Sequence, residues 1–322
     1  MILVLRALGI GDLATAVPAL RGLRSAFPDR TLALAAPAWL APLVELVGGV
    51  DRLVRCDRLD GPDRLPAGGR PDLAVNLHGS GPRSHRLLAA AGPDRLWAFA
   101  CPAAGHRVGP PWIGDEHEVR RWCRLLAWYG VPTDPAELSL HRPAGSRMPT
   151  GTSVVHVGGK DSRRRWSSER FAAVARALDQ LGHHVVITGS AADRGIAEYV
   201  AERAGLPAPA VLAGRTDLAG LAALVAGGRL VVSTDTGVGH LATGYGTPSV
   251  LLFGPEPPRR WGPPPERWWH RVIWHEDRAG LPFDPGRDAI HPALAAIAAD
   301  DVIEAVAEVD RPAGLGHAAA AR

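Results

Sequence analysis

A single carboxylate stands in a glycine-rich turn directly after the first apolar run, in the segment Gly9-Ile10-Gly11-Asp12-Leu13-Ala14. An aspartate on a sharp loop at the carboxyl end of a strand can take a proton from a bound hydroxyl group, as a general base. Aspartate is also a common cap for the first turn of a helix, and the local spacing does not separate these two roles. We expect Gly9 and Gly11 to allow a tight turn that presents Asp12 to a ligand.

The same segment matches the dinucleotide fingerprint G-x-G-x-x-[GA]. That use requires an acidic residue about 20 positions further on, at the end of the second strand, to bind the ribose. The second apolar run instead ends Leu34-Ala35-Ala36-Pro37, and Asp12 places negative charge where a pyrophosphate has to bind. A nicotinamide-dependent oxidoreductase is therefore an alternative that both observations disfavour.

A second candidate site is the segment Ser233-Thr234-Asp235-Thr236-Gly237-Val238-Gly239-His240, which follows a buried apolar run. At a strand-to-helix turn of this kind, free main-chain N–H groups and the positive end of the helix dipole favour an anion. We expect Thr236 and Gly237 to supply the amides, and Asp235 either to brace the loop or to bind a sugar hydroxyl. His240 either donates to a phosphate or packs as a structural histidine.

Two further groups follow strands in the same half of the chain. The basic loop 160–165 contains Lys160 and Arg164, and it either neutralises a diphosphate or is simply solvated. Asp193 follows Thr188-Gly189-Ser190 and either binds a ribose diol or caps the next helix. No Asp-x-Asp pair occurs in the chain, which disfavours the transferases that hold a divalent metal on such a pair. We expect no metal site.

The elements that position these residues alternate between short apolar runs and helical patterns, which predicts parallel sheets covered by helices on both faces. Expected strands are 2–5, 31–35, 53–55, 73–77, 96–99, 153–157, 184–188, 210–212, 230–233 and 249–253. Expected helices are 12–27, 38–47, 83–91, 116–129, 168–181, 193–204, 218–226, 239–245 and 301–309. The stretch 257–263 is too rich in proline for regular structure.

Length and composition set the domain organisation. The 322 residues suggest two domains, and a stretch rich in Pro, Gly and Ser between 131 and 151 has the composition of a linker. We therefore expect an α/β chain with two Rossmann-like parallel-sheet domains, 1–148 and 149–310, that face each other across a cleft. A disordered tail, 311–322, follows them.

Charge and cysteine usage limit the cellular setting. Basic and acidic residues number 36 and 33, so the net charge neither favours nor excludes nucleic acid, and we expect no nucleic-acid partner. The three cysteines show no metal-ligand spacing, and no apolar run reaches the roughly 18 residues that span a bilayer. These observations favour a protein of the reducing cytoplasm.

Three motifs together resemble glycosyltransferase family 9, whose members include the ADP-heptose:lipopolysaccharide heptosyltransferases. They are Gly11-Asp12 followed by Pro18-Ala19-Leu20, the late segment from Ser233 to Ala242, and Leu252-Phe253-Gly254-Pro255. The resemblance covers nearly the whole chain. It implies a GT-B fold in which the first domain binds the acceptor and the second binds the nucleotide sugar. It also implies a metal-independent, inverting transfer with no cofactor besides the nucleotide-sugar co-substrate, ADP-heptose.

The resemblance also implies roles for individual residues. Asp12 deprotonates the acceptor hydroxyl, and the amides of Thr236 and Gly237, with a cation of the loop 160–165, stabilise the departing diphosphate. Asp193 matches the position that usually holds a glutamate near the ribose. Asp235 and His240 match the donor-site motif.

The sequence departs from the family pattern at three points. The lysine that commonly stands two residues before the tryptophan is here Arg164, so either it or Lys160 contacts the diphosphate. Glu256-Pro257-Pro258 replaces the usual Thr-Asp-Pro after the Gly-Pro pair. Lys160 is the only lysine, and the Arg-, Ala- and Gly-rich composition suits a GC-rich organism without lipopolysaccharide.

These departures leave the acceptor open: a glycan, a lipid-linked sugar reached by peripheral membrane contact, or a small natural product. A non-catalytic protein that binds nucleotide sugars is a second alternative function, beside the oxidoreductase. It predicts donor binding without turnover.

Overall fold

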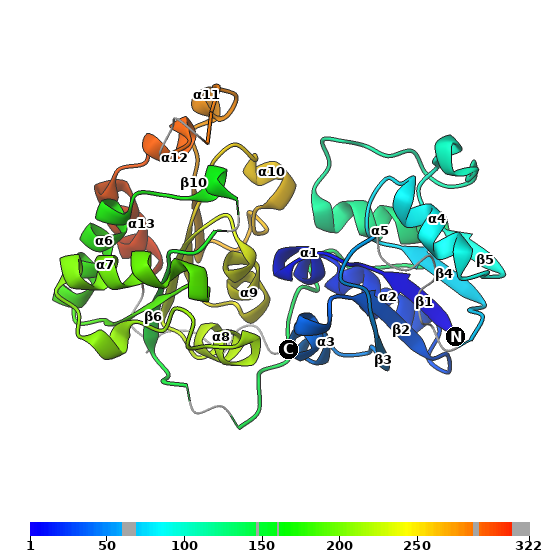
Figure 1. Cartoon of the computed structure of the whole chain (residues 1–322), viewed down its shortest axis with the longest axis horizontal. Coiled ribbons are helices and arrows are strands. Elements are labelled where there is room, and N and C mark those ends of the chain that lie inside the picture. Colours follow the sequence, from blue (N-terminus) through cyan, green and yellow to red (C-terminus); the bar gives the residue numbers. More distant parts are fainter. Residues whose placement is uncertain (60–68, 146–147, 160, 286–289, 311–322) are drawn as a thin grey trace. The chain divides into compact units, whose positions relative to one another are not determined.

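The computed structural model describes residues 1–59, 69–145, 148–159, 161–285 and 290–310. It contains two parallel five-stranded sheets, each within its own compact unit (Figure 1). The units are Met1–His141 and Arg142–Arg322, so the division falls inside the expected linker, a little before the predicted boundary at 148. The expected class of two Rossmann-like parallel-sheet domains is confirmed. The predicted tail 311–322 lies outside the described residues, as does Lys160.

The first sheet has the strand order β3-β2-β1-β4-β5. Its strands are β1 (Ile2–Leu5), β2 (Leu32–Ala36), β3 (Arg52–Arg55), β4 (Leu73–Asn76) and β5 (Arg95–Trp97). Leu5 at the end of β1 lies opposite Ala35 on one side and Asn76 on the other. The chain reverses its direction of winding between β1 and β4, and such a switch point is where open α/β sheets bind ligands.

The helices of the first unit cover both faces of its sheet. They are α1 (Ile10–Thr15), α2 (Val17–Ala26), α3 (Ala41–Val47), α4 (Arg83–Ala90) and α5 (Glu118–Trp128). The expectation of one continuous helix over 12–27 is wrong, because α1 ends before Ala16 and α2 begins after it. Pro18 has no N–H and its ring clashes with the carbonyl one turn earlier, so the helix must restart there.

The second sheet repeats this plan with the order β10-β9-β8-β6-β7. Its strands are β6 (Thr152–His156), β7 (His184–Thr188), β8 (Leu230–Thr234), β9 (Ser249–Leu252) and β10 (His270–Ile273). The switch point lies between β6 and β8. The edge strand β10 was not predicted because it lacks a continuous apolar run. The expected strand 210–212 is wrong: Pro207 and Pro209 hold a 3-10 turn, η5 (Ala208–Ala210), and only a single bridge joins Val211 to Ile187.

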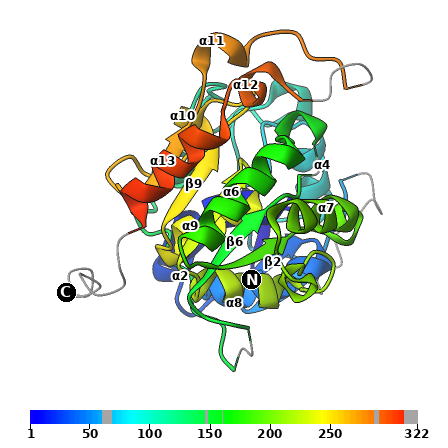
Figure 2. The same ribbon diagram turned by 90° about the vertical axis from the view of Figure 1, so that its left-hand side faces the viewer.

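Helices also cover both faces of the second sheet. They are α6 (Ser168–Gln180), α7 (Arg194–Ala204), α8 (Leu218–Ala226), α9 (Gly237–Tyr245), α10 (Pro258–Trp261), α11 (Glu276–Ala279), α12 (Pro292–Ala295) and α13 (Ala299–Val309). Helix α13 lies beside α6 (Figure 2), while α8 and α9 contact each other and strands β6 and β8. The short α10 falls in the stretch expected to lack regular structure, because proline is tolerated in the first turn of a helix.

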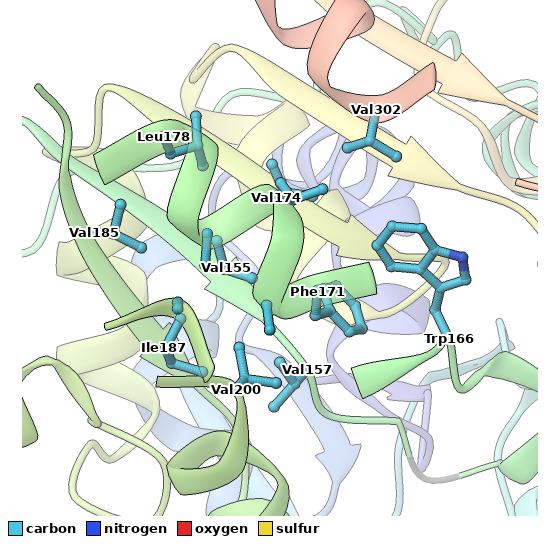
Figure 3. Close-up of a cluster of buried hydrophobic side chains, with 14 of the residues drawn as sticks. Val155, Val157, Trp166, Phe171, Val174, Leu178, Val185, Ile187, Val200 and Val302 are labelled. Carbon is cyan, nitrogen blue, oxygen red and sulfur yellow. The ribbon is translucent and has the colours of Figure 1, made fainter. Parts of the chain in front are cut away.

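The core of the second unit lies between the sheet and helices α6, α7 and α13 (Figure 3). Trp166 and Phe171 are both buried and meet there edge to face with ring centroids 4.9 Å apart. Trp166 Nε1 also donates to the carbonyl of Ile297. This anchor fixes the end of the basic loop that precedes α6.

No helix among the described residues has both the length and the apolar character needed to cross a membrane.

Candidate active site

Asp12 lies in the first turn of α1, just beyond the carboxyl end of β1. Its Oδ2 accepts a hydrogen bond from the Gly9 N–H at 3.1 Å, and its Oδ1 lies 3.6 Å from a guanidinium nitrogen of Arg6. Arg6 Nε also donates to the main-chain oxygen of Asp12 at 2.8 Å. The Asp12 side chain keeps 28% of its surface exposed. The carboxylate therefore caps the helix, one of its two expected roles, and remains accessible for the other.

Arg6 is fully buried, and its guanidinium lies within 4 Å of the carboxylates of Asp12 and Glu118. Its guanidinium donates to the carbonyl of Leu77, to Thr15 Oγ1 and to Glu118 Oε1, and lies 4.5 Å above the ring of Trp122. Sequence analysis missed this residue. The available signal was a charged side chain directly after the apolar run of β1, at a position where only a paired charge is stable.

The two glycines of the turn do not act as expected. Gly9 has φ −95° and ψ −171°, an extended conformation that any residue adopts, and Gly11 lies inside α1. Neither has a positive φ. The prediction that the glycines allow a tight turn is therefore wrong, since the turn is held by the Asp12 carboxylate and by Arg6.

The second switch point brings Arg164 and Asp235 together from the loops that follow β6 and β8. Arg164 Nη1 lies 3.2 Å from Asp235 Oδ2 and donates to the main-chain oxygen of Asp235 at 3.1 Å. Asp235 is only 5% exposed. Its carboxylate therefore braces the loop, which was the first of the two roles expected for it.

Helix α9 begins directly after this ion pair. Thr236 is its N-cap residue, but its side chain makes no capping bond and Oγ1 instead lies 2.9 Å from Ser233 Oγ. The first N–H groups of a helix have no intrahelical carbonyl partner. The Gly239 N–H donates to the Thr236 carbonyl at 3.1 Å, so the amides of Gly237 and Val238 are the ones that suit an anion.

A pocket opens at this end of α9. His240 and Trp261 meet in it with ring centroids 6.1 Å apart. Of the tryptophans between 261 and 274, Trp261 is the one that contributes to this lining. The lining residues are Thr234, Asp235, Thr236, Gly239, His240, Thr243, Leu251, Phe253, Trp261 and Pro263.

Asp193 is buried and turned back onto its own loop. Its Oδ2 accepts from the N–H of Ser190 at 2.9 Å and from Ser190 Oγ at 2.6 Å. These bonds close a capping box on the short 3-10 turn η4 (Ala191–Asp193), whereas α7 receives no capping bond from the Asp193 side chain. The ribose contact remains a prediction. A Cβ on Gly158 would lie 2.9 Å from both Asp193 Oδ2 and His156 Nε2, so these polar groups converge where only glycine leaves room.

His156, at the end of β6, is a further polar group that sequence analysis missed. Its Nδ1 lies 3.0 Å from Thr188 Oγ1. Burial lowers the pKa of His156 to about 4, although the nearby Asp193 carboxylate acts in the opposite direction. The imidazole is therefore neutral at pH 7.

The described part of the basic loop contains one exposed arginine and one arginine that pairs with a buried carboxylate. Arg163 is exposed and pairs with Asp161 at 2.6 Å, and this hydrogen bond lowers the pKa of the Asp161 carboxyl group. Arg163 is therefore solvated, whereas Arg164 points to the second switch point, and its contact with a diphosphate remains a prediction. Among the residues that the structure describes, no three His, Cys, Asp or Glu side chains are grouped to hold a metal ion.

Two solved structures of glycosyltransferases have the same fold as this chain. A glycosyl transferase family 9 protein from Veillonella parvula matches with a TM-score of 0.77 and 22% identity, over 96% of each chain. The E. coli ADP-heptose lps heptosyltransferase II matches with a TM-score of 0.75 and 21% identity, over 96% of this chain and 98% of that one. The fold is therefore the GT-B fold of these enzymes.

The sequence comparisons identify the family. The model of glycosyltransferase family 9 (heptosyltransferase) matches residues 94–277, which is more than half of the chain, so the protein belongs to this family. The Lipopolysaccharide heptosyltransferase 3 of Escherichia coli is 31% identical over 157 residues. That match covers 48% of this chain and 45% of the relative, which is less than half of the relative's length.

Proposed function

We propose that the protein is a glycosyltransferase that moves heptose from ADP-heptose to a hydroxyl group of a glycan, lipid-linked or small-molecule acceptor. The observation that carries this proposal is Asp12, an accessible carboxylate held at the first switch point by Arg6 and the Gly9 N–H. Family membership and the names of the relatives support the choice of heptose and ADP. If the acceptor is lipid-linked, we expect the protein to contact the membrane surface that carries it.

In this mechanism Asp12 acts as the general base. It removes the proton of the acceptor hydroxyl while the hydroxyl oxygen attacks the anomeric carbon of the heptose. The bond from that carbon to the diphosphate oxygen breaks, ADP leaves, and the single displacement inverts the anomeric configuration. Fixing Asp12 through two partners keeps its carboxylate in position to accept the proton of the acceptor hydroxyl.

The second unit stabilises the leaving group. Negative charge develops on the diphosphate as the sugar departs, and donors already aimed at it lower the barrier. We assign this task to the first amides of α9 at Thr236 and Gly237, to His240, and to Arg164 or Lys160. These groups supply the charge that a metal supplies in other transferases, so we propose a metal-independent reaction without a further cofactor.

We also propose that the enzyme works in the cytoplasm. The cysteines Cys56, Cys101 and Cys123 are all buried and free, as suits a reducing compartment.

The decisive experiment measures ADP release from ADP-heptose together with calorimetric binding of ADP, UDP, GDP, dTDP and NAD, with and without Mg²⁺. We expect selective binding of ADP that is independent of Mg²⁺. Asp12→Asn keeps a side-chain oxygen for the Gly9 N–H but cannot accept the proton, so transfer should fall by at least about a hundredfold while ADP binding is retained.

Other results point to other functions. Full activity of Asp12→Asn contradicts the assignment of the base. Selective binding of another nucleotide keeps the mechanism but changes the donor, and tight binding of NAD alone favours the oxidoreductase. Donor binding without turnover with any acceptor favours a non-catalytic protein.

A further inference from the structure

His78 lies just beyond the carboxyl end of β4, on the loop next to that of Asp12. Three hydrogen bonds join the two loops: Leu77 N–H to the Leu5 carbonyl, Arg6 Nη1 to the Leu77 carbonyl, and Ala7 N–H to His78 Nδ1 at 3.2 Å. Because β1 and β4 are neighbours at the switch point, the imidazole and the Asp12 carboxylate belong to the same edge of the same sheet.

The bond from Ala7 determines the tautomer of His78. Nδ1 accepts an N–H, so in the neutral ring the proton is on Nε2. Burial, reinforced by the Arg6 cation, lowers the pKa of His78 to about 4, with the Asp12 carboxylate acting in the opposite direction. The ring therefore presents a neutral Nε2–H donor at pH 7.

The backbone that carries His78 is held by a buried amide. Asn76 is fully buried, and its Oδ1 accepts from the His78 N–H at 3.0 Å. The Asn76 Nδ2 group donates to Ser84 Oγ at 2.9 Å and lies 3.0 Å from His85 Nδ1. The position of the His78 Nε2–H group is thus fixed by Asn76, Ser84 and His85 before a ligand binds.

The neighbouring His85 shows what a structural histidine looks like in this unit. It is 1% exposed, and both of its ring nitrogens are engaged, Nδ1 with Asn76 and Nε2 with the carbonyl of Phe99 at 2.8 Å. His78 differs because it is only partly buried, and within the described residues its Nε2 has no partner. A preformed donor is thus left available beside a preformed base.

We propose that His78 binds the acceptor sugar through Nε2–H, which donates to an oxygen adjacent to the hydroxyl group that Asp12 deprotonates. A donor and a proton acceptor on neighbouring loops fit two adjacent oxygens of a sugar. This inference rests on the proposed function. It assigns His78 to the binding of the acceptor sugar and not to the binding of ADP-heptose.

Two substitutions separate this role from a structural one. His78→Asn keeps an oxygen near the position of Nδ1 for the Ala7 N–H but removes the Nε2–H. His78→Gln extends an amide N–H toward the position of Nε2 and restores the donor. Urea unfolding of both variants establishes that they are folded, and ADP binding establishes that their nucleotide-binding site is intact.

The assay follows ADP release from ADP-heptose with heptose-free lipopolysaccharide and with a panel of free sugars as acceptor probes. Losing one hydrogen bond should raise the acceptor KM of His78→Asn about tenfold and leave the ADP-heptose KM within about twofold of the wild type. His78→Gln should recover most of the loss. An unchanged acceptor KM in His78→Asn, or an equal rise in both KM values, overturns the role of His78.

The same assay separates this inference from the function on which it rests. No ADP release by the wild-type protein with any probe overturns the proposed function, and the acceptor role with it. Nitrogen NMR of the His78 ring provides a test that does not depend on activity. We expect a neutral Nε2–H ring at pH 7, and a protonated Nδ1 overturns the proposal.

Discussion

Arg164 and Asp235 form an ion pair that joins the two loops at the switch point of the second sheet. The guanidinium contacts both the carboxylate, at 3.2 Å, and the main-chain oxygen of Asp235, at 3.1 Å. Asp235 is almost completely buried, whereas one third of the Arg164 side chain is exposed. One cation can therefore hold the loop before α9 and still offer a face to an anion.

Replacing Arg164 by alanine should weaken ADP binding. The substitution removes a cation next to the α9 amides and leaves the buried Asp235 carboxylate with less compensation, so we expect a loss of about tenfold in affinity by calorimetry. Arg163→Ala is the matched control, because its exposed side chain pairs with Asp161. Equal losses in the two variants would contradict a specific role for Arg164.

Replacing Arg6 by methionine should destabilise the first unit strongly. Removal of the cation leaves the buried Glu118 carboxylate and Asp12 without their shared partner, so we expect the free energy of unfolding to fall by about 3–5 kcal/mol in urea titrations. Arg55→Met is the control, since the Arg55 side chain is 76% exposed and pairs only at the surface. A loss below about 1 kcal/mol for Arg6→Met would show that the buried pair is dispensable.

Stability should fall between about pH 6.5 and pH 4. Burial lowers the pKa of His78 and His156 to about 4 and that of His270 to about 3, so these rings are neutral in the folded state and titrate near 6.5 when unfolded. Their contribution is fully present above pH 6.5 and is lost as the pH falls toward the folded values. Each ring contributes at most roughly 1.4 kcal/mol per pH unit within that window.

Urea unfolding at a series of pH values measures this dependence. His270 Nδ1 lies 2.8 Å from Ser249 Oγ, and His270→Asn should make the dependence less steep. Carboxyl groups such as Asp51, whose pKa is lowered by the Leu32 N–H, lose their contribution only below about pH 5. The histidine contribution is therefore measured between about pH 6.5 and pH 5. An unfolding midpoint that stays constant from about pH 7 to pH 4.5 would contradict the prediction.

Replacing Asp310 by asparagine should loosen the end of α13. Its carboxylate pairs with Arg229 at 2.6 Å and with the buried His183 at 3.2 Å. We expect a loss of about 1–3 kcal/mol in the free energy of unfolding. Glu308→Gln is the control on the same helix, because Glu308 pairs with Arg271 at the exposed surface and should change stability by less than about 0.5 kcal/mol. Similar losses of stability in both variants would contradict a specific role for the Asp310 carboxylate.

Most of the fold was predictable because both sheets are parallel and buried on both faces. Their strands are therefore short apolar runs, and the helices between them carry the 3.6-residue pattern. The errors fall where this rule does not hold. Edge strand β10 begins His270-Arg271 and lacks the apolar run, and Pro18 divides a helix whose apolar stripe continues across the break.

The candidate site was predictable only in part. Asp12, Asp235 and Thr236 each follow a strand in a recognisable turn, so their positions at the carboxyl ends of the sheets came from local sequence. Arg6 and His78 carried no such motif. Each acts through residues about 70 positions away in the chain, as in the bonds between Arg6 and Leu77 and between Ala7 and His78.

Local sequence therefore determines which residues lie at the carboxyl ends of the strands, because strand and helix patterns depend on neighbours in the chain. The tertiary structure alone decides the partners of those residues. Parallel pairing of β1 with β4 brings Arg6 and Asp12 next to His78, and pairing of β6 with β8 brings Arg164 to Asp235. Charges and hydrogen bonds act over a few ångströms of space, whatever the separation along the chain, so their consequences appear only once the sheets have formed.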